Sequence, residues 1–160
     1  MDVRRLAIRC LASASAAVLV SCGGTPAAPA AGTFLRLTGT IDQSVVTRNS
    51  PASLTFQLEN VGGQSVTLTF PSSCQINPYI VERGSGRIVY PAGGAWVCAT
   101  VVTTMDLVSR GVAVQSVLVR AADTTTPSGA SLPAGEYAAY ATVDANEVQL
   151  RSGTIAFVVQ

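Results

Sequence analysis

The sequence offers few side chains that could perform acid, base or nucleophilic chemistry. Its ten basic residues are all arginine, it has nine acidic residues, and it has no histidine. Ser-His-Asp and Cys-His mechanisms need a base whose pKa lies near neutrality, which histidine usually supplies. The lack of lysine also removes Schiff-base chemistry and Ser-Lys pairs. The sequence therefore excludes these mechanisms and predicts a protein that is not an enzyme.

Three other motifs could hold a substrate or a cofactor, and each has a simpler interpretation. Asp144 and Glu147 could form a carboxylate pair, but they flank Asn146 in an expected hairpin loop, where solvated turn residues are usual. Gly84-Ser85-Gly86 lacks the rest of a phosphate-binding motif and predicts a turn. Asp123-Thr124-Thr125-Thr126 lacks the alternating oxygen ligands of calcium loops. We expect no cofactor and no metal.

The cysteines predict the cellular location of the protein and a disulfide bond. A basic segment, residues 1–9, precedes an uncharged run, residues 10–20, which is too short to span a bilayer and suits a signal peptide. The run ends in Leu19-Val20-Ser21-Cys22, which resembles the bacterial lipobox. That motif implies cleavage before Cys22 and lipid attachment to its thiol, which would hold the protein on a membrane.

The alternative is an ordinary secretory signal cut between residues 21 and 24, with Cys22 unmodified; export follows in both cases. We expect a signal peptide at residues 1–21, a Gly/Pro/Ala tether at residues 22–32, and one domain at residues 33–160. The expected location is the bacterial cell membrane or the outer membrane, reached through lipid on Cys22.

Cys74 and Cys98 are the cysteines left for pairing if Cys22 carries lipid. An oxidising compartment favours a disulfide between them. A metal site is the competing explanation, but the sequence has no histidine and no CxxC pair to complete a tetrahedral ligand set.

The elements that would carry these residues are short strands. Leu54, Phe56 and Leu58 alternate with polar residues, as do Val66, Leu68 and Phe70, which is the pattern of strands with one buried face. A turn at residues 60–63 separates the two runs. Further strands are expected at residues 34–41, 76–83, 87–90, 112–121, 136–144 and 154–159. The chain is therefore expected to be all-β, an immunoglobulin-like antiparallel β-sandwich of about 7–9 strands, with little helix.

Two aromatic residues allow two interpretations each. Tyr137 stands where immunoglobulin-like sandwiches place a tyrosine whose hydroxyl bonds back to the backbone upstream, but it could equally be an aromatic at a strand edge. Trp96 could be an exposed binding residue, or it could pack in the core beside the expected disulfide.

Three motifs occur in an order that resembles a known family. The first is Leu58-Glu59-Asn60-Val61-Gly62, which is followed by the expected strand at residues 66–70 and by Pro71-Ser72. The second is Ile80-Val81-Glu82-Arg83, followed by Gly86-Arg87-Ile88-Val89-Tyr90. The third is Leu132-Pro133-Ala134-Gly135-Glu136-Tyr137. Together they resemble the BsuPI-type domain, named after an intracellular proteinase inhibitor, over residues 53–159. The resemblance implies inhibition of a proteinase. The sequence departs from the family pattern at Asn77-Pro78 and at Tyr90.

Charge and architecture limit the expected partners. Only 12% of residues are charged and the net charge is +1, so a nucleic-acid partner is not expected. In addition to the membrane itself, the expected partner is an envelope protein or a protease. The first hypothesis is a non-catalytic module that binds a protein or peptide through residues 71–75, 91–95 and 122–133. The candidate partner-binding residues are Thr124, Thr125, Thr126, Pro127 and Ser128. The alternatives are a BsuPI-type proteinase inhibitor and a structural envelope component.

Overall fold

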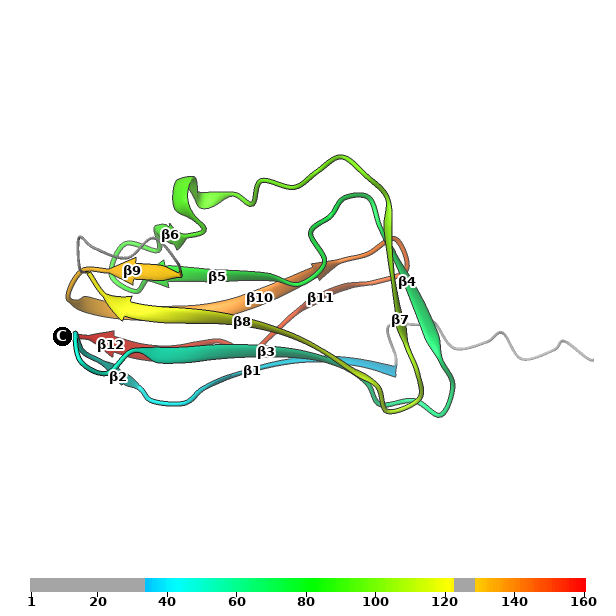
Figure 1. The fold of residues 1–160 in the computed structure, drawn as a ribbon, viewed down its shortest axis with the longest axis horizontal. Helices are drawn as coiled ribbons and strands as arrows, with labels where there is room; N and C mark the ends of the chain where they lie inside the picture. Colours follow the sequence, from blue (N-terminus) through cyan, green and yellow to red (C-terminus); the bar gives the residue numbers. More distant parts are fainter. Residues whose placement is uncertain (1–33, 123–128) are drawn as a thin grey trace, which may run out of the picture.

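The computed structural model of the protein describes residues 34–122 and 129–160. These residues form two stacked sheets and a short two-stranded ribbon (Figure 1). The first sheet has the order β1-β3-β8-β9. Its strands are β1 (Leu35–Ile41), β3 (Ala52–Asn60), β8 (Val112–Ala121) and β9 (Ala130–Leu132).

The second sheet has the order β2-β12-β10-β5-β6, and β11 also pairs with β10. Its strands are β2 (Val45–Val46), β12 (Ile155–Val159), β10 (Gly135–Asp144), β5 (Asn77–Glu82), β6 (Ile88–Tyr90) and β11 (Gln149–Arg151). The ribbon consists of β4 (Val66–Phe70) and β7 (Thr103–Leu107), which lie across one end of the sandwich (Figure 1).

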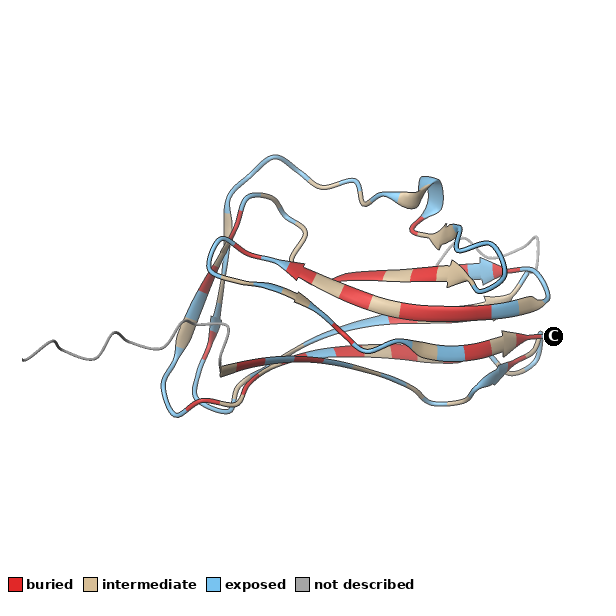
Figure 2. Ribbon diagram, turned by 180° about the vertical axis from the view of Figure 1, so that it is seen from behind, coloured by how far each residue is buried: buried red, intermediate tan, exposed pale blue. Residues whose placement is uncertain are grey.

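The core forms because successive side chains of a strand point to opposite faces. In β3, Leu54, Phe56 and Leu58 are fully buried, while the residues between them are half-buried or exposed. In β10, Ala139 and Ala141 face the same interior from the other sheet. Figure 2 shows this alternation as bands of buried and partly exposed residues along the strands. The all-β sandwich that the alternation predicts is confirmed.

The details differ from the expectation in two ways. The described residues contain twelve strands rather than seven to nine, because β2, β6, β9 and β11 have only two or three residues each. Two edge pairs, β12 with β2 and β8 with β9, are parallel, so the sheets are mixed. Helix is scarce, as expected: the described residues contain a 3-10 turn, η2 (Ala92–Gly94), and no α-helix.

The turn at residues 60–63 does not close a hairpin, because β3 and β4 belong to different sheets. Asn60, which is fully buried, explains the change of direction. Its side-chain amide donates to the carbonyls of Gln64, Leu107 and Val108 at 2.7, 3.0 and 3.1 Å. Its side-chain oxygen accepts from the amide of Gly62 at 3.0 Å. Asn60 therefore ties the end of β3 to the ribbon.

The Tyr137 hydroxyl bonds back to the backbone upstream, as one interpretation of the sequence predicts, and we call this arrangement the corner. Tyr137 is 2% exposed, and its hydroxyl donates to the carbonyl of Pro133, four residues upstream, at 2.9 Å. Its ring stacks on Phe157 with the centroids 5.7 Å apart. Burial raises the pKa of the Tyr137 hydroxyl. The bond fixes the entry of the chain into β10, the central strand of the second sheet.

A helix long and apolar enough to cross a bilayer does not occur in the part of the chain that the structure describes.

Candidate functional site

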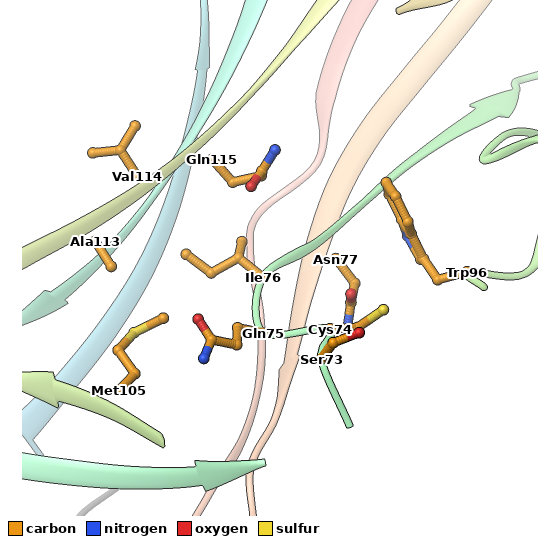
Figure 3. A pocket seen from close by; sticks show the side chains of 10 residues that line it. All are labelled: Ser73, Cys74, Gln75, Ile76, Asn77, Trp96, Met105, Ala113, Val114 and Gln115. Carbon is orange, nitrogen blue, oxygen red and sulfur yellow. The ribbon is translucent and has the colours of Figure 1, made fainter. Parts of the chain in front are cut away.

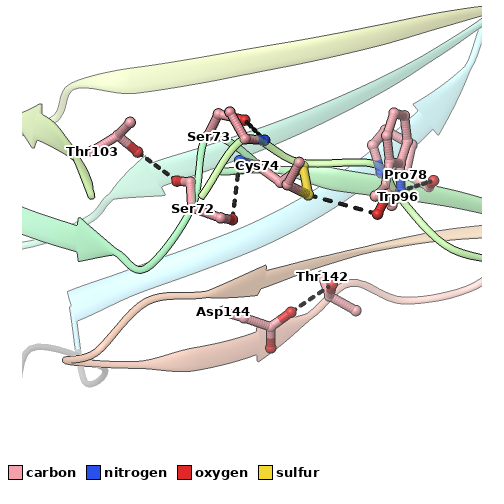
Figure 4. The surroundings of a disulfide bond; sticks show 10 residues. Ser72, Ser73, Cys74, Pro78, Trp96, Thr103, Thr142 and Asp144 are labelled. Atoms are coloured by element: carbon pink, nitrogen blue, oxygen red, sulfur yellow. Dashed lines mark hydrogen bonds between the residues drawn. A yellow bond between two sulfur atoms is a disulfide. The ribbon is translucent and has the colours of Figure 1, made fainter. Parts of the chain in front are cut away.

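A disulfide joins two loops on one flank of the sandwich. Cys74 and Cys98 are bonded, with their Cα atoms 5.5 Å apart (Figure 4). Cys74 belongs to residues 71–76, between β4 and β5, and Cys98 belongs to residues 91–102, between β6 and β7. We call these two segments the linked loops. The disulfide expected from the sequence is confirmed.

Hydrogen bonds beside the disulfide hold the linked loops together as well. The amide of Ser73 donates to the carbonyl of Ala99 at 3.1 Å, and the amide of Ala99 donates to the Ser73 hydroxyl at 2.9 Å. The hydroxyl of Thr103 donates to the carbonyl of Ser72 at 2.8 Å. Residues 98–103 are therefore fixed to residues 72–74 by a covalent bond and by three hydrogen bonds (Figure 4).

The longer of the two linked loops, residues 91–102, is called the long loop, and it begins with a turn that two glycines allow. Gly93 and Gly94 have φ values of 79° and 80°, in the left-handed region that favours glycine. The amide of Gly94 donates to the carbonyl of Pro91 at 3.0 Å. The turn directs the chain back along β5 toward the ribbon (Figure 1). Ala95 then resumes an extended backbone, with φ −135° and ψ 146°.

Trp96 fastens the middle of the long loop to the edge of the second sheet. Its indole Nε1 donates to the carbonyl of Pro78 in β5 at 3.1 Å. Its ring meets Tyr90 edge to face, with centroids 5.5 Å apart and an interplanar angle of 85°. Burial raises the pKa of the Tyr90 hydroxyl. Trp96 is half-buried, so it is neither a core residue nor a free binding aromatic.

Apolar side chains on the long loop remain in solvent. Val97 is 99% exposed, although its neighbours Trp96 and Cys98 are both anchored. Val101 and Val102 are 51% and 67% exposed. Val97, Val101 and Val102 are therefore candidates for contact with another molecule.

A cleft of about 390 Å³ lies beside the disulfide (Figure 3). Ala113 and Val114 of β8 line one side, and Trp96 lies on the other. The remaining lining residues are Ser73, Cys74, Gln75, Ile76, Asn77, Met105 and Gln115. These side chains carry hydroxyl, amide and apolar groups but no carboxylate or base. The cleft can bind a peptide or an apolar group and has no group for acid or base catalysis.

The structure places the residues expected to bind a partner in two regions. Residues 71–75 and 91–95 belong to the linked loops, as the disulfide requires. The third segment, residues 122–133, is not a continuous loop as predicted, because Ala130–Leu132 form β9. This strand pairs with β8 at the end of the sandwich opposite the ribbon (Figure 1). The segment's candidate contact residues 124–128 lie outside the described residues, as does Cys22. Sequence reasoning missed residues 96–102, because Val97 beside Trp96 and Cys98 resembles a core segment.

Glu147 is an exposed residue between β10 and β11, as expected, but its side chain also has a structural partner. Its carboxylate accepts from the backbone amide of Thr69 in β4 at 2.8 Å, although the residue is exposed. This hydrogen bond lowers the pKa of the Glu147 carboxyl. Asp144 instead accepts from the Thr142 hydroxyl at 3.1 Å. The two acidic residues therefore have structural partners of their own. Among the described residues, no three His, Cys, Asp or Glu side chains gather as a metal site would require.

Solved structures resemble the chain only distantly. One is the DNA-bound alkylpurine DNA glycosylase AlkC of Pseudomonas fluorescens, with 14% identity and a TM-score of 0.43 over 79% of this chain and 30% of the glycosylase. Another is the CARDB domain of the PF1109 protein of Pyrococcus furiosus, with 21% identity and a TM-score of 0.44 over 79% of this chain and 90% of that domain. The PapD-like domain 7 of human CEP192 has 18% identity and a TM-score of 0.30, over 92% and 94% of the two chains. The chain spans less than a third of the glycosylase, and none of these similarities bears on function.

The family comparison is more specific. No curated protein matches the sequence. The profile of the family described as "BsuPI: Intracellular proteinase inhibitor" matches residues 40–148. The match covers most of the chain and includes both linked loops with their disulfide. The chain belongs to the BsuPI family of intracellular-proteinase-inhibitor domains.

Proposed function

We propose that the protein is an exported, lipid-anchored proteinase inhibitor that binds its target through the linked loops. The observation that carries this proposal is a loop of the BsuPI domain held by a disulfide and by hydrogen bonds while its apolar side chains stay exposed. A loop that is already ordered loses little conformational entropy when a partner binds it. The lack of carboxylate or basic groups in the neighbouring cleft agrees with a role as inhibitor rather than enzyme.

The location rests on the lipobox-like sequence that ends at Cys22. Lipid on this residue would place the domain at a membrane surface in an oxidising compartment, where the Cys74–Cys98 disulfide is stable. The amide of Val61 donates to the carbonyl of Phe34 at 2.7 Å, which fixes the start of the domain at the ribbon end. Eleven residues between Cys22 and Phe34 could span at most about 40 Å when fully extended. The linked loops would therefore face proteases close to the membrane.

The test is a protease panel with the full chain purified in detergent. Serine, cysteine and metalloproteases would be assayed with micromolar protein. Slowing of at least one class, competitive with a peptide substrate, is the expected result. If no protease of any class slows, the protein is not an inhibitor.

The cleft favours a second candidate function, a module that binds a peptide without inhibiting a protease. Its amide and hydroxyl groups could pair with a peptide backbone. Copurification of an envelope protein by the wild type but not by an Ala113→Arg variant, with an unaffected protease panel, would select this function.

The anchor is tested separately, by intact mass spectrometry and detergent partitioning of the wild type and a Cys22→Ala variant. Added acyl mass and a detergent-phase location for the wild type alone are expected. If both proteins stay in the aqueous phase, the anchor is wrong.

A further inference from the structure

We propose that Val97 is the residue that the long loop inserts into the primary specificity pocket of a serine endopeptidase that prefers small aliphatic side chains. This inference rests on the proposed inhibitor function and names the segment and the class of enzyme. It is drawn from the exposure of Val97, the anchoring of its neighbours and the conformation of the backbone around it.

The exposure of Val97 is exceptional for its surroundings. It is 99% exposed, whereas the other exposed large hydrophobic residues range from 44% to 67%. Each of those retains some contact with the domain, but Val97 has almost none. A side chain must project in this way if it is to enter a pocket on another protein. The residue is apolar, so leaving water for such a pocket is favourable.

The residues on either side of Val97 are held in place. Trp96 is fixed by its hydrogen bond to Pro78 and by its ring contact with Tyr90. Cys98 is fixed by the disulfide, and Ala99 pairs with Ser73 through both its amide and its carbonyl. Val97 therefore lies between two anchored residues, so the loop needs little further conformational ordering when it binds an enzyme.

The backbone of Val97 is free to pair with an enzyme. Among the described residues, neither its amide nor its carbonyl has a hydrogen-bond partner. Ala95 is extended, and none of residues 95–102 has a positive φ. Endopeptidases bind substrates as extended strands, through main-chain hydrogen bonds and alternating side-chain pockets. The segment around Val97 can be bound in the same way.

The anchors also explain why such a loop would inhibit instead of being consumed. Attack of the serine hydroxyl on the Val97–Cys98 peptide bond forms an ester between the serine and Val97, and the hydroxyl proton goes to the departing amine of Cys98. The amine would stay attached to Cys74 through the disulfide, and the acyl group of Val97 would stay beside the anchored Trp96. Because the two ends remain adjacent, the amine can attack the acyl-enzyme, displace its serine hydroxyl and restore the peptide bond.

The side chain of Val97 sets the class of enzyme. Serine endopeptidases select this position by pocket shape and charge: trypsin places an aspartate at the base of its pocket, chymotrypsin has a hydrophobic slot, and elastase has a small pocket. A branched aliphatic side chain fits the small pocket. Val101 and Val102 are poorer candidates, because the amide of Val101 donates to the carbonyl of Ala99 at 2.9 Å and bends the chain there.

The experiment compares inhibition of elastase, trypsin and chymotrypsin by the wild type, Val97→Arg and the matched control Val108→Arg, all as full chains in detergent. Val108 is 63% exposed and lies between β7 and β8, outside the linked loops. The wild type and Val108→Arg should inhibit elastase. Val97→Arg should inhibit elastase at least about tenfold more weakly and should acquire inhibition of trypsin. An unchanged profile for Val97→Arg, or a wild type that inhibits only a cysteine or metalloprotease, would overturn the role of Val97 while the inhibitor function stands. A wild type that inhibits no protease removes both.

A second measurement uses the anchor at Cys98. After the disulfide is reduced, elastase should cleave the wild type after Val97, and the protein should no longer inhibit elastase. Mass spectrometry would identify the two fragments. A first cut elsewhere in the linked loops would contradict the assignment.

Discussion

The carboxylate of Glu147 accepts a hydrogen bond from the backbone amide of Thr69 at 2.8 Å. The amide of Asn146 donates in turn to the carbonyl of Thr69 at 2.9 Å. These bonds join the loop between β10 and β11 to β4, although in the described residues the β4–β7 ribbon shares no ladder with either sheet. The ribbon carries one end of each linked loop, so contacts that hold the ribbon also position the candidate site.

Glu147→Gln should change how the stability of the protein depends on pH. The hydrogen bond from Thr69 lowers the pKa of the Glu147 carboxyl below its unfolded value of 4.5. The charged form therefore stabilises the fold above that pH, and this contribution is lost as pH falls through the lower folded value. The variant should be less stable than the wild type at pH 7, and the difference should shrink on acidification to pH 3. Urea unfolding at several pH values measures this.

The matched control for that series is Glu136→Gln, which removes an exposed carboxylate whose ion pair with Arg83 is 3.4 Å long. Exposed ion pairs contribute little, so this variant should follow the wild type closely. If the two variants behave alike, the bond to Thr69 has no energetic importance.

Asn60→Asp should be strongly destabilising. The substitution places a carboxylate against the carbonyls of Gln64, Leu107 and Val108, which now receive hydrogen bonds from the amide. The loss of these hydrogen bonds and the burial of a charge should lower the free energy of unfolding by about 3 kcal/mol or more. Asn49→Asp makes the same chemical change at an exposed turn and should have a small effect. Equal unfolding midpoints for the two variants would refute the role of Asn60.

Local patterns predicted the long strands well, because the alternation of Leu54, Phe56 and Leu58 reports which face is buried. Strand β7 was missed since only Leu107 among its five residues is buried, and its partner β4 lies far away in the sequence. The disulfide followed from the expected compartment and the cysteine count. The exposure of Val97 could not be predicted, because it depends on Trp96 reaching Pro78 and on Cys98 reaching Cys74, which are both tertiary contacts.

The disulfide should contribute substantially to stability. Its cysteines are 24 residues apart, and closing such a loop stabilises a fold by about 3.5 kcal/mol in the chain-entropy treatment. The Cys74→Ser/Cys98→Ser double variant should lose about this free energy of unfolding. Wild-type protein under reductant should show the same loss. If it keeps its full stability after reduction, the hydrogen bonds between Ser73 and Ala99 hold the linked loops without the covalent bond.

Tyr137→Phe should isolate the energy of the corner at the start of β10. The ring and its stacking on Phe157 remain, and only the 2.9 Å bond from the hydroxyl to the carbonyl of Pro133 is lost. Because Pro133 is exposed, water can replace the donor, and the cost should be about 1 kcal/mol. Tyr140→Phe is the control, since the Tyr140 hydroxyl has no hydrogen-bond partner among the described residues. If denaturant unfolding shows equal losses for the two variants, the corner bond contributes nothing beyond the burial of its ring.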